Sequence, residues 1–341
     1  MVADTLQKCI DKFPFEPDTQ VIKDLEKALE YRTSGKVPDA ISNTYLQDLA
    51  IPQIVLFDIL ANRFPLVMEA QSLVNKLFCE KASGYASVVL LDIGIGRGLQ
   101  MERLLKAMNG MTDLTMVRVI GVEISSPALE FTTTMMQRLQ GELSFKLEFH
   151  PIHSAVETMD FETIKSLSEI PDAILLANAS LCLHHLQTIA EREKLFEGLR
   201  SLNPALLTLI EPNTDCFTAD FPRRLDNAYE HFNALYRFIN TLDLTADEKT
   251  GLKQFFSTEL FDAVALPEDF RFERYQRGEQ WISLGKSSQF KSCNLQEHCK
   301  QIQIPHIAAD VAPSGFVNFQ FANCDILSVM ALEPDDNNQA P

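Results

Sequence analysis

The chain has 341 residues, of which 46% are apolar and 23% are charged, with only 13 glycines and 16 prolines. This composition is typical of a globular protein with one enlarged domain or two domains, and it excludes a disordered or low-complexity chain. The 47 acidic residues outnumber the 30 Lys and Arg residues, and the formal net charge of -17 disfavours binding to nucleic acid or to an anionic membrane surface.

The first residues, MVADTLQKCIDKF, carry charges where a signal peptide would need an apolar stretch, and no apolar run of about 18 residues follows. The seven cysteines form no CxxC pair, and their odd number does not fit a disulfide framework. We therefore expect a cytoplasmic protein with reduced thiols and no membrane partner.

From residue 1 to about 80 the apolar side chains recur at helical spacing, as between Leu66 and Phe78, which predicts an all-helical segment. Between residues 87 and 211 the pattern changes to the short runs SVVLLD, MVRVIGVE, SFKLEF, DAILLAN and ALLTLIE, separated by amphipathic stretches. Nearly continuous apolar runs are typical of parallel strands that are covered on both faces. The sequence therefore predicts an α/β fold with a doubly wound, Rossmann-like sheet.

The helical period returns over residues 218–262, which predicts an insertion that joins the first helices as a cap over the carboxyl edge of the sheet. FRFERY at 270–275 and CDILSVMAL at 324–332 predict two final strands, which brings the sheet to about seven. The predicted organisation is a helical cap at 1–80, a core at 81–332 that contains the insertion, and a frayed tail at 333–341.

A glycine-rich turn follows the first predicted strand directly and precedes the helical pattern LQMERLLKAM. It contains Asp92, Gly94, Gly96 and Gly98 in the spacing DxGxGxG, which suits a backbone that passes close to a ligand at a helix N-terminus. The second predicted strand ends at Glu123, where an acid typically binds ribose hydroxyls. This spacing, with the acid first, is typical of S-adenosylmethionine sites. The alternative at this point is that both acids only cap helices or lie at solvated strand ends.

Polar side chains follow the fourth and fifth predicted strands, where ligands of open α/β sheets bind. Asn178 is expected beside the cofactor, and His184, His185 or Glu211 could take a proton from a hydroxyl or amine acceptor. The alternative for one of the histidines is a role as a helix-capping or core residue.

Further residues are expected to contact the substrate. Asn213 and Arg223 would orient a carboxylate, while Phe221 and Tyr229 would form the far wall of a pocket for a small, partly apolar molecule. No metal site is expected, because the HxxH pair His150 and His153 ends a strand with no helix to aim both rings at one ion.

Three stretches resemble the GRAS family, best known as plant transcription regulators: VVLLDIGIGRGLQ at 88–100, LCLHHL at 181–186 and LNPALLTLIEPN at 202–213, the last followed by FPRRLDNAYEHFNALYRFI. Order and spacing match over roughly residues 50–330. The resemblance implies a class I methyltransferase fold with a helical cap, and it adds Gln100 to the cofactor-binding residues and Asn75 to the substrate-binding ones. Plant members have a degenerate glycine turn, whereas Gly94 and Gly96 restore it, so this chain is similar to a bacterial-type member.

Two function classes stay open. One is an S-adenosylmethionine-dependent methyltransferase that methylates oxygen or nitrogen of a small, partly apolar molecule. The other is a non-catalytic GRAS-type regulator that keeps the cofactor pocket and binds a ligand, a second copy or another protein through the helical cap. Direct nucleic-acid binding is not expected, because the chain is acidic and has no basic stripe.

Overall fold

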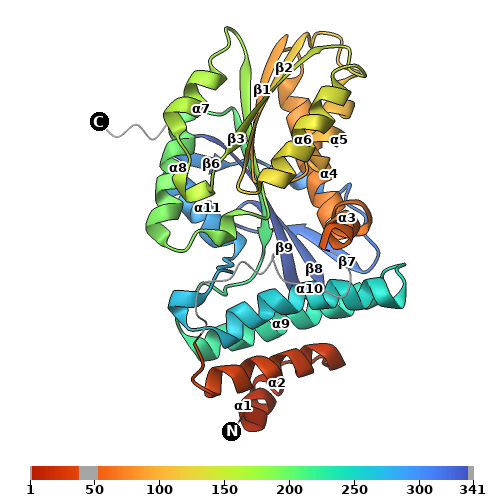
Figure 1. The fold of residues 1–341 in the computed structure, drawn as a ribbon, viewed down its shortest axis with the longest axis vertical. Helices are drawn as coiled ribbons and strands as arrows, with labels where there is room; N and C mark the ends of the chain where they lie inside the picture. The colour runs from red at the N-terminus through yellow and green to blue at the C-terminus, as the bar shows by residue number, and fades with distance from the viewer. Residues whose placement is uncertain (1, 38–52, 337–341) are drawn as a thin grey trace.

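Nine strands form a single sheet in residues 2–37 and 53–336, which are the residues that a computed structural model of the chain describes (Figure 1). The strands are β1 (Ser87–Ile93), β2 (Met116–Glu123), β3 (Lys146–His153), β4 (Ile174–Ser180), β5 (Leu206–Pro212), β6 (Phe290–Ser292), β7 (Ile307–Val311), β8 (Phe316–Phe321) and β9 (Cys324–Pro334).

The strand order is β3-β2-β1-β4-β5-β9-β8-β7, and β6 also pairs with β9. The first five strands are parallel, while β9 runs antiparallel to β5. This order confirms the predicted doubly wound, Rossmann-like sheet, with nine strands where the sequence indicated about seven. The direction of winding reverses between β1 and β4, which is where such sheets bind ligands beyond their carboxyl ends.

Both faces of the sheet are buried at the central strands β1, β4 and β5, as their apolar sequences predict. Val88 and Leu90 of β1 pack in one core cluster, while Val89 and Leu91 pack in the other, because successive side chains of a strand point to opposite faces. The helices α4 (Pro65–Ala82), α5 (Leu99–Met108) and α6 (Ser126–Leu139) lie on one side of the sheet in Figure 1, and α7 (Phe161–Ser168), α8 (Ile189–Leu202) and α11 (Gly278–Ser287) lie on the other.

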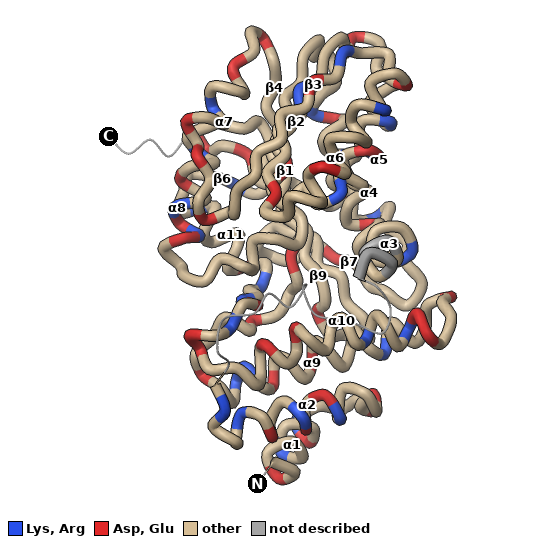
Figure 2. Tube along the Cα trace, in the orientation of Figure 1, with Lys and Arg blue, Asp and Glu red and all other residues tan. Residues whose placement is uncertain are grey.

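A separate layer of helices lies at one end of the molecule (Figure 1). It contains α1 (Val2–Ile10), α2 (Thr19–Thr33), α9 (Phe221–Thr241) and α10 (Ala246–Ala265). Helix α2 packs on α9 and α10, and α9 packs on β8 and β9. Because the start of β9 lies beside the end of β5, α9 crosses the carboxyl end of β5, as expected for a cap. Figure 2 shows charges of both signs interspersed along α2, α9 and α10.

Helix α4 differs from the sequence interpretation, which grouped it with the cap. Its buried side chains, among them Val74 and Phe78, pack against α5, β5 and β9, so α4 belongs to a layer of the sheet. Helix α3 (Gln53–Arg63) precedes it and contacts both α4 and α10. The rest of the predicted N-terminal segment, residues 38–52, lies outside the described residues. The division into domains stays a prediction.

Two sequence-based boundaries are wrong. β9 continues to Pro334, so residues 333 and 334 belong to a strand and not to the expected frayed tail, and residues 337–341 lie outside the described part. FRFERY is not a strand: the 3-10 turn Glu268–Phe270 leads into the irregular residues 271–277. The sequence predicts a strand here, but the amides of Phe272 and Glu273 donate to the carboxylate of Asp262 and pair with no strand.

The remaining short elements are α12 (Gln296–Cys299) and the 3-10 turns Val156–Thr158 and Leu183–His185. Among the described residues, no helix combines the length and the apolarity that a bilayer crossing requires.

Candidate functional site

The glycine turn joins β1 to α5 and depends on left-handed backbone. Gly94, Gly96 and Gly98 have φ values of 71°, 54° and 69°, a region that other L-residues adopt only at a cost. The amides of Gly94 and Ile95 donate to the carbonyl of Val122 in β2, at 2.9 and 3.0 Å. The turn is therefore anchored to the neighbouring strand and begins α5 at the carboxyl edge of the sheet.

The three glycines differ in what surrounds them. A Cβ atom at Gly98 would lie 2.6 Å from Met135 Cε, and one at Gly94 would lie 2.7 Å from the Cβ of Cys182. Close packing against α6 and against the loop after β4 therefore explains why these two positions are glycine. At Gly96 the nearest such atom is the Gly94 carbonyl oxygen, at 4.0 Å. Gly96 thus faces a space that side chains of the described residues leave open.

The two predicted acids lie beside this turn on neighbouring strands. Asp92 is buried, and Asn178 Nδ2 donates to its Oδ1 at 2.7 Å. Burial raises the pKa of Asp92 to about 7, the Asn178 bond opposes this shift, and the negative charge of Glu123 adds to it. The Glu123 carboxylate accepts the amides of Gly96, at 2.9 Å, and Ser125, at 2.8 Å. The prediction that both acids lie at the turn is confirmed; their role toward a ligand stays a prediction.

Exposed apolar side chains beside the turn were not considered in the sequence analysis. Ile124 directly follows Glu123 and is 61% exposed, and Phe131 is 43% exposed with the Arg97 guanidinium 3.9 Å from its ring centre. His153 Nε2 lies 2.8 Å from the carbonyl oxygen of Ile124, which fixes this loop. An apolar residue directly after an acid at a strand end is the signal that could have identified Ile124.

A buried charged group lies behind the turn, at the ends of β4 and β5. We call His184, His185, Glu211 and Glu273 the histidine cluster. His184 Nδ1 lies 2.6 Å from Glu211 Oε2, and its Nε2 lies 3.3 Å from Glu273 Oε2. His185 Nδ1 is 3.8 Å from the same Glu273 oxygen. The other oxygen of Glu211 accepts the amides of Cys182 and Leu183, so this carboxylate also caps the 3-10 turn that carries both histidines.

The three predicted catalytic residues of the cluster differ in their protonation and in their exposure to solvent. Burial lowers the pKa of His184, but the carboxylates of Glu211 and Glu273 outweigh it and raise this pKa to about 10. At neutral pH His184 is therefore protonated and cannot act as a base, and Glu211 is fully buried. Burial and the charge of His184 lower the pKa of His185 to about 4. Of the three, only His185 has a partly exposed side chain, at 23%.

Glu273 was not predicted, and it comes from residues 271–277, which we call the covering segment. The amide of Arg274 donates to the carbonyl oxygen of His184, and the fully buried Arg192 donates to the carbonyl oxygens of Leu186 and Arg274. These bonds hold the segment against the histidines. The alternation in FRFERY would place Phe272 on an apolar face and Glu273 on the opposite one, so nothing in the sequence indicates that Glu273 is buried against the histidines.

Three of the predicted ligand-binding residues are occupied by bonds within the protein. Asn75 on α4 donates through Nδ2 to the backbone carbonyl oxygen of Gln100 on α5, and Gln100 Nε2 donates to Asn75 Oδ1, both at 3.4 Å, which joins the two helices. Asn213 is buried, donates to Asn318 and accepts the amide of Gly278. These contacts give each residue a structural task that the sequence did not indicate.

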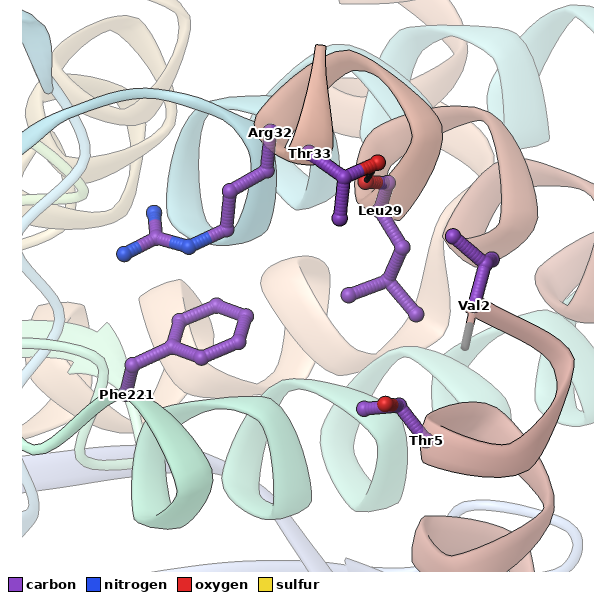
Figure 3. A pocket seen from close by; sticks show the side chains of 6 residues that line it. All are labelled: Val2, Thr5, Leu29, Arg32, Thr33 and Phe221. Carbon is purple, nitrogen blue, oxygen red and sulfur yellow. Dashed lines mark hydrogen bonds between the residues drawn. The ribbon is translucent and has the colours of Figure 1, made fainter. Parts of the chain in front are cut away.

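The other predicted substrate residues lie on the cap. Arg223 is exposed and pairs with Asp215 at 3.1 Å. Phe221 lines a cavity of about 290 Å³ between α1, α2 and α9, where the Arg32 guanidinium lies 3.9 Å from its ring centre (Figure 3). Its remaining lining residues are Val2, Thr5, Leu29 and Thr33.

Tyr229 is fully buried, and its ring packs against Phe13 and Phe15. The expectation that Phe221 and Tyr229 form one wall of a pocket at the sheet edge is therefore wrong. The physical reason is that this face of α9 is turned toward the N-terminal helices, where its apolar side chains are buried.

Comparisons with known proteins agree with this architecture. A model of the GRAS domain family matches residues 12–320. The chain is 27% identical over 221 residues to chitin-inducible gibberellin-responsive protein 2 of Oryza sativa subsp. japonica (61% of this chain, 40% of that protein). It is 23% identical over 210 residues to Scarecrow-like transcription factor PAT1 of Arabidopsis thaliana (58% of this chain, 42% of that protein).

A solved structure of SCL7 from Oryza sativa has a TM-score of 0.80 at 18% identity and covers 97% of this chain and 99% of that chain. At this identity the likeness shows the fold. The chain spans about 40% of the length of the two curated relatives named above.

Proposed function

This chain belongs to the GRAS domain family, and we propose that it binds S-adenosylmethionine at its glycine turn and transfers the methyl group to oxygen or nitrogen of a small, partly apolar molecule. The observation that carries the proposal is the space at Gly96, which lies between two acids at the point where the sheet reverses its winding. Gly94 and Gly98 have packing reasons to be glycine, whereas Gly96 needs its small size only if something outside the described residues approaches it.

The residues around the turn fit the chemical parts of this cofactor. The Glu123 carboxylate, beside the Gly96 amide, would accept hydrogen bonds from ribose hydroxyls. The exposed Ile124 offers an apolar surface to the adenine ring. Asp92 lies beneath the turn and accepts a hydrogen bond from Asn178. Because burial raises its pKa to about 7, its carboxyl group is partly ionised at neutral pH. When bound, the cofactor supplies an activated methyl group, and the protein contributes positioning and exclusion of water.

The histidine cluster limits the chemistry available for the acceptor. Because His184 and Glu211 are buried and paired with each other, we assign them to holding the 3-10 turn in place. His185 is the member whose side chain reaches solvent.

A non-catalytic regulator that keeps the cofactor site is the second candidate. The name of one relative, a transcription factor, favours it, and so does the burial of two of the three predicted catalytic side chains.

Turnover separates the two functions. The full chain is incubated with S-adenosylmethionine and a fraction of small metabolites, and S-adenosylhomocysteine is measured. A methyltransferase produces it together with an equal amount of a methylated product, and Glu123→Ala abolishes both. Saturable binding without S-adenosylhomocysteine would support the regulator, and the absence of binding would contradict both functions. Glu297→Ala is the matched control, because it makes the same change at a carboxylate on α12 that is 79% exposed.

A further inference from the structure

The histidine cluster brings together three atoms of the kind that bind transition metals. His184 Nε2, His185 Nδ1 and Glu273 Oε2 all lie within 4.8 Å of one another. The two distances to the Glu273 oxygen are 3.3 and 3.8 Å. A tetrahedral ion at about 2.0–2.1 Å from its ligands separates them by about 3.3 Å. The first distance already has this value, and the second would need to shorten by about 0.5 Å.

Glu211 orients the first of these histidines. Its Oε2 lies 2.6 Å from His184 Nδ1, so the proton on Nδ1 is held there and Nε2 is turned toward Glu273. A metal ion at Nε2 would displace the proton that this nitrogen carries in the metal-free protein, so binding would release a proton to solvent. A carboxylate on one ring nitrogen of a histidine whose other nitrogen faces further ligands is the usual outer arrangement of metal sites. Glu211 is itself fixed by the amides of Cys182 and Leu183, so the ring has one orientation.

Charge and access also suit a cation. Glu211 and Glu273 are both fully buried and both face His184, which places two carboxylates around one imidazole. The side chain of His185 is 23% exposed, whereas its Nδ1 is buried together with the other two proposed ligand atoms, so an ion would have to enter past the His185 ring. Two imidazole nitrogens and one carboxylate favour zinc, cobalt or iron over magnesium or calcium, which prefer oxygen ligands.

We propose that His184, His185 and Glu273 bind a divalent transition-metal ion, with zinc as the expected ion and Glu211 as the positioning residue for His184. Three protein ligands leave the fourth position of a tetrahedral ion for water or substrate. Where the proposed methyl transfer holds, a bound ion would help an acceptor hydroxyl to lose its proton, a role that His185 as a ligand cannot then fill as a base. This last step rests on the proposed function; the binding of the ion does not.

The test uses the full chain after treatment with EDTA, titrated with Zn²⁺ by calorimetry and with Co²⁺ by visible absorption. We expect one equivalent of each ion to bind, and the Co²⁺ spectrum to lack the thiolate charge-transfer bands that any of the seven cysteines would give. His185→Phe keeps an aromatic ring against Phe272, which stacks on His185 at 4.4 Å, and should weaken binding more than about 100-fold. Glu273→Gln keeps the shape of the side chain and should have the same effect.

Glu211→Gln should weaken binding by about 10- to 100-fold, as the loss of an outer carboxylate does. The matched control is His150→Ala, which removes a surface histidine of β3 and should bind as the wild type does. Absence of stoichiometric binding, or binding that survives His185→Phe, would overturn the proposal. S-adenosylmethionine is left out of these titrations, so a failure here is distinct from a failure of the proposed function.

Discussion

A single methyl group at Gly96 should separate ligand binding from folding. Gly96→Ala keeps the left-handed backbone, which costs a non-glycine residue about 1–2 kcal/mol, and its new Cβ meets no atom closer than 4.0 Å. We therefore expect a loss of about 1–2 kcal/mol in the free energy of unfolding. The methyl group enters the space that we assign to the cofactor, so affinity for S-adenosylmethionine should fall below detection.

Gly84 provides the matched control. It has a φ of 85°, nothing lies within 4 Å of the position of its Cβ, and it joins α4 to β1 away from the turn. Gly84→Ala should lose the same 1–2 kcal/mol, roughly, and keep wild-type binding. Urea unfolding followed by circular dichroism gives the stabilities, and calorimetric titration gives the affinities. If Gly96→Ala binds S-adenosylmethionine like the wild type, or if Gly84→Ala loses binding equally, the space at Gly96 is not the cofactor site.

Three further predictions concern stability. The pKa of Asp92 rises from 3.8 to about 7 on folding, so the stability that Asp92 contributes is lost as pH rises through this window; the difference in unfolding free energy between wild type and Asp92→Asn should therefore fall between pH 4 and pH 7 in urea unfolding and level off above it. Arg192→Met leaves two buried carbonyl groups without a donor and should lower the free energy of unfolding by about 2–6 kcal/mol. Amide hydrogen exchange in the covering segment should become faster, and unchanged exchange there would show that Arg192 does not hold this segment in place. Arg223→Ala breaks an exposed pair with Asp215 and should change the unfolding free energy by less than about 1 kcal/mol.

The sheet could be predicted because each of its parallel strands is marked by a short stretch of neighbouring residues in the sequence. Each parallel strand is a short apolar run, and the glycine turn follows the first strand with the acid and glycines in a fixed spacing. The second acid, Glu123, could be placed beside the turn because consecutive parallel strands of this topology end at the same edge. None of these steps needs to know which side chains meet over long distances.

The acceptor side of the site could not be predicted for the opposite reason. Glu273 reaches His184 from 89 residues along the chain, and it does so through an irregular segment held by Arg192 and Asp262. Phe221 and Tyr229 share an apolar stripe, but a stripe does not say what it packs against, and the N-terminal helices bury it.

The central claim is that Gly96 faces the cofactor site, and a crystal structure of the chain grown with S-adenosylhomocysteine tests it most directly. We expect the ligand to lie against Gly96, with its ribose hydroxyls on Glu123 and its adenine ring on Ile124. An empty glycine turn at a ligand concentration that saturates the chain in titration, or the ligand bound instead in the cavity at Phe221 and Arg32, would show that Gly96 does not face the cofactor site.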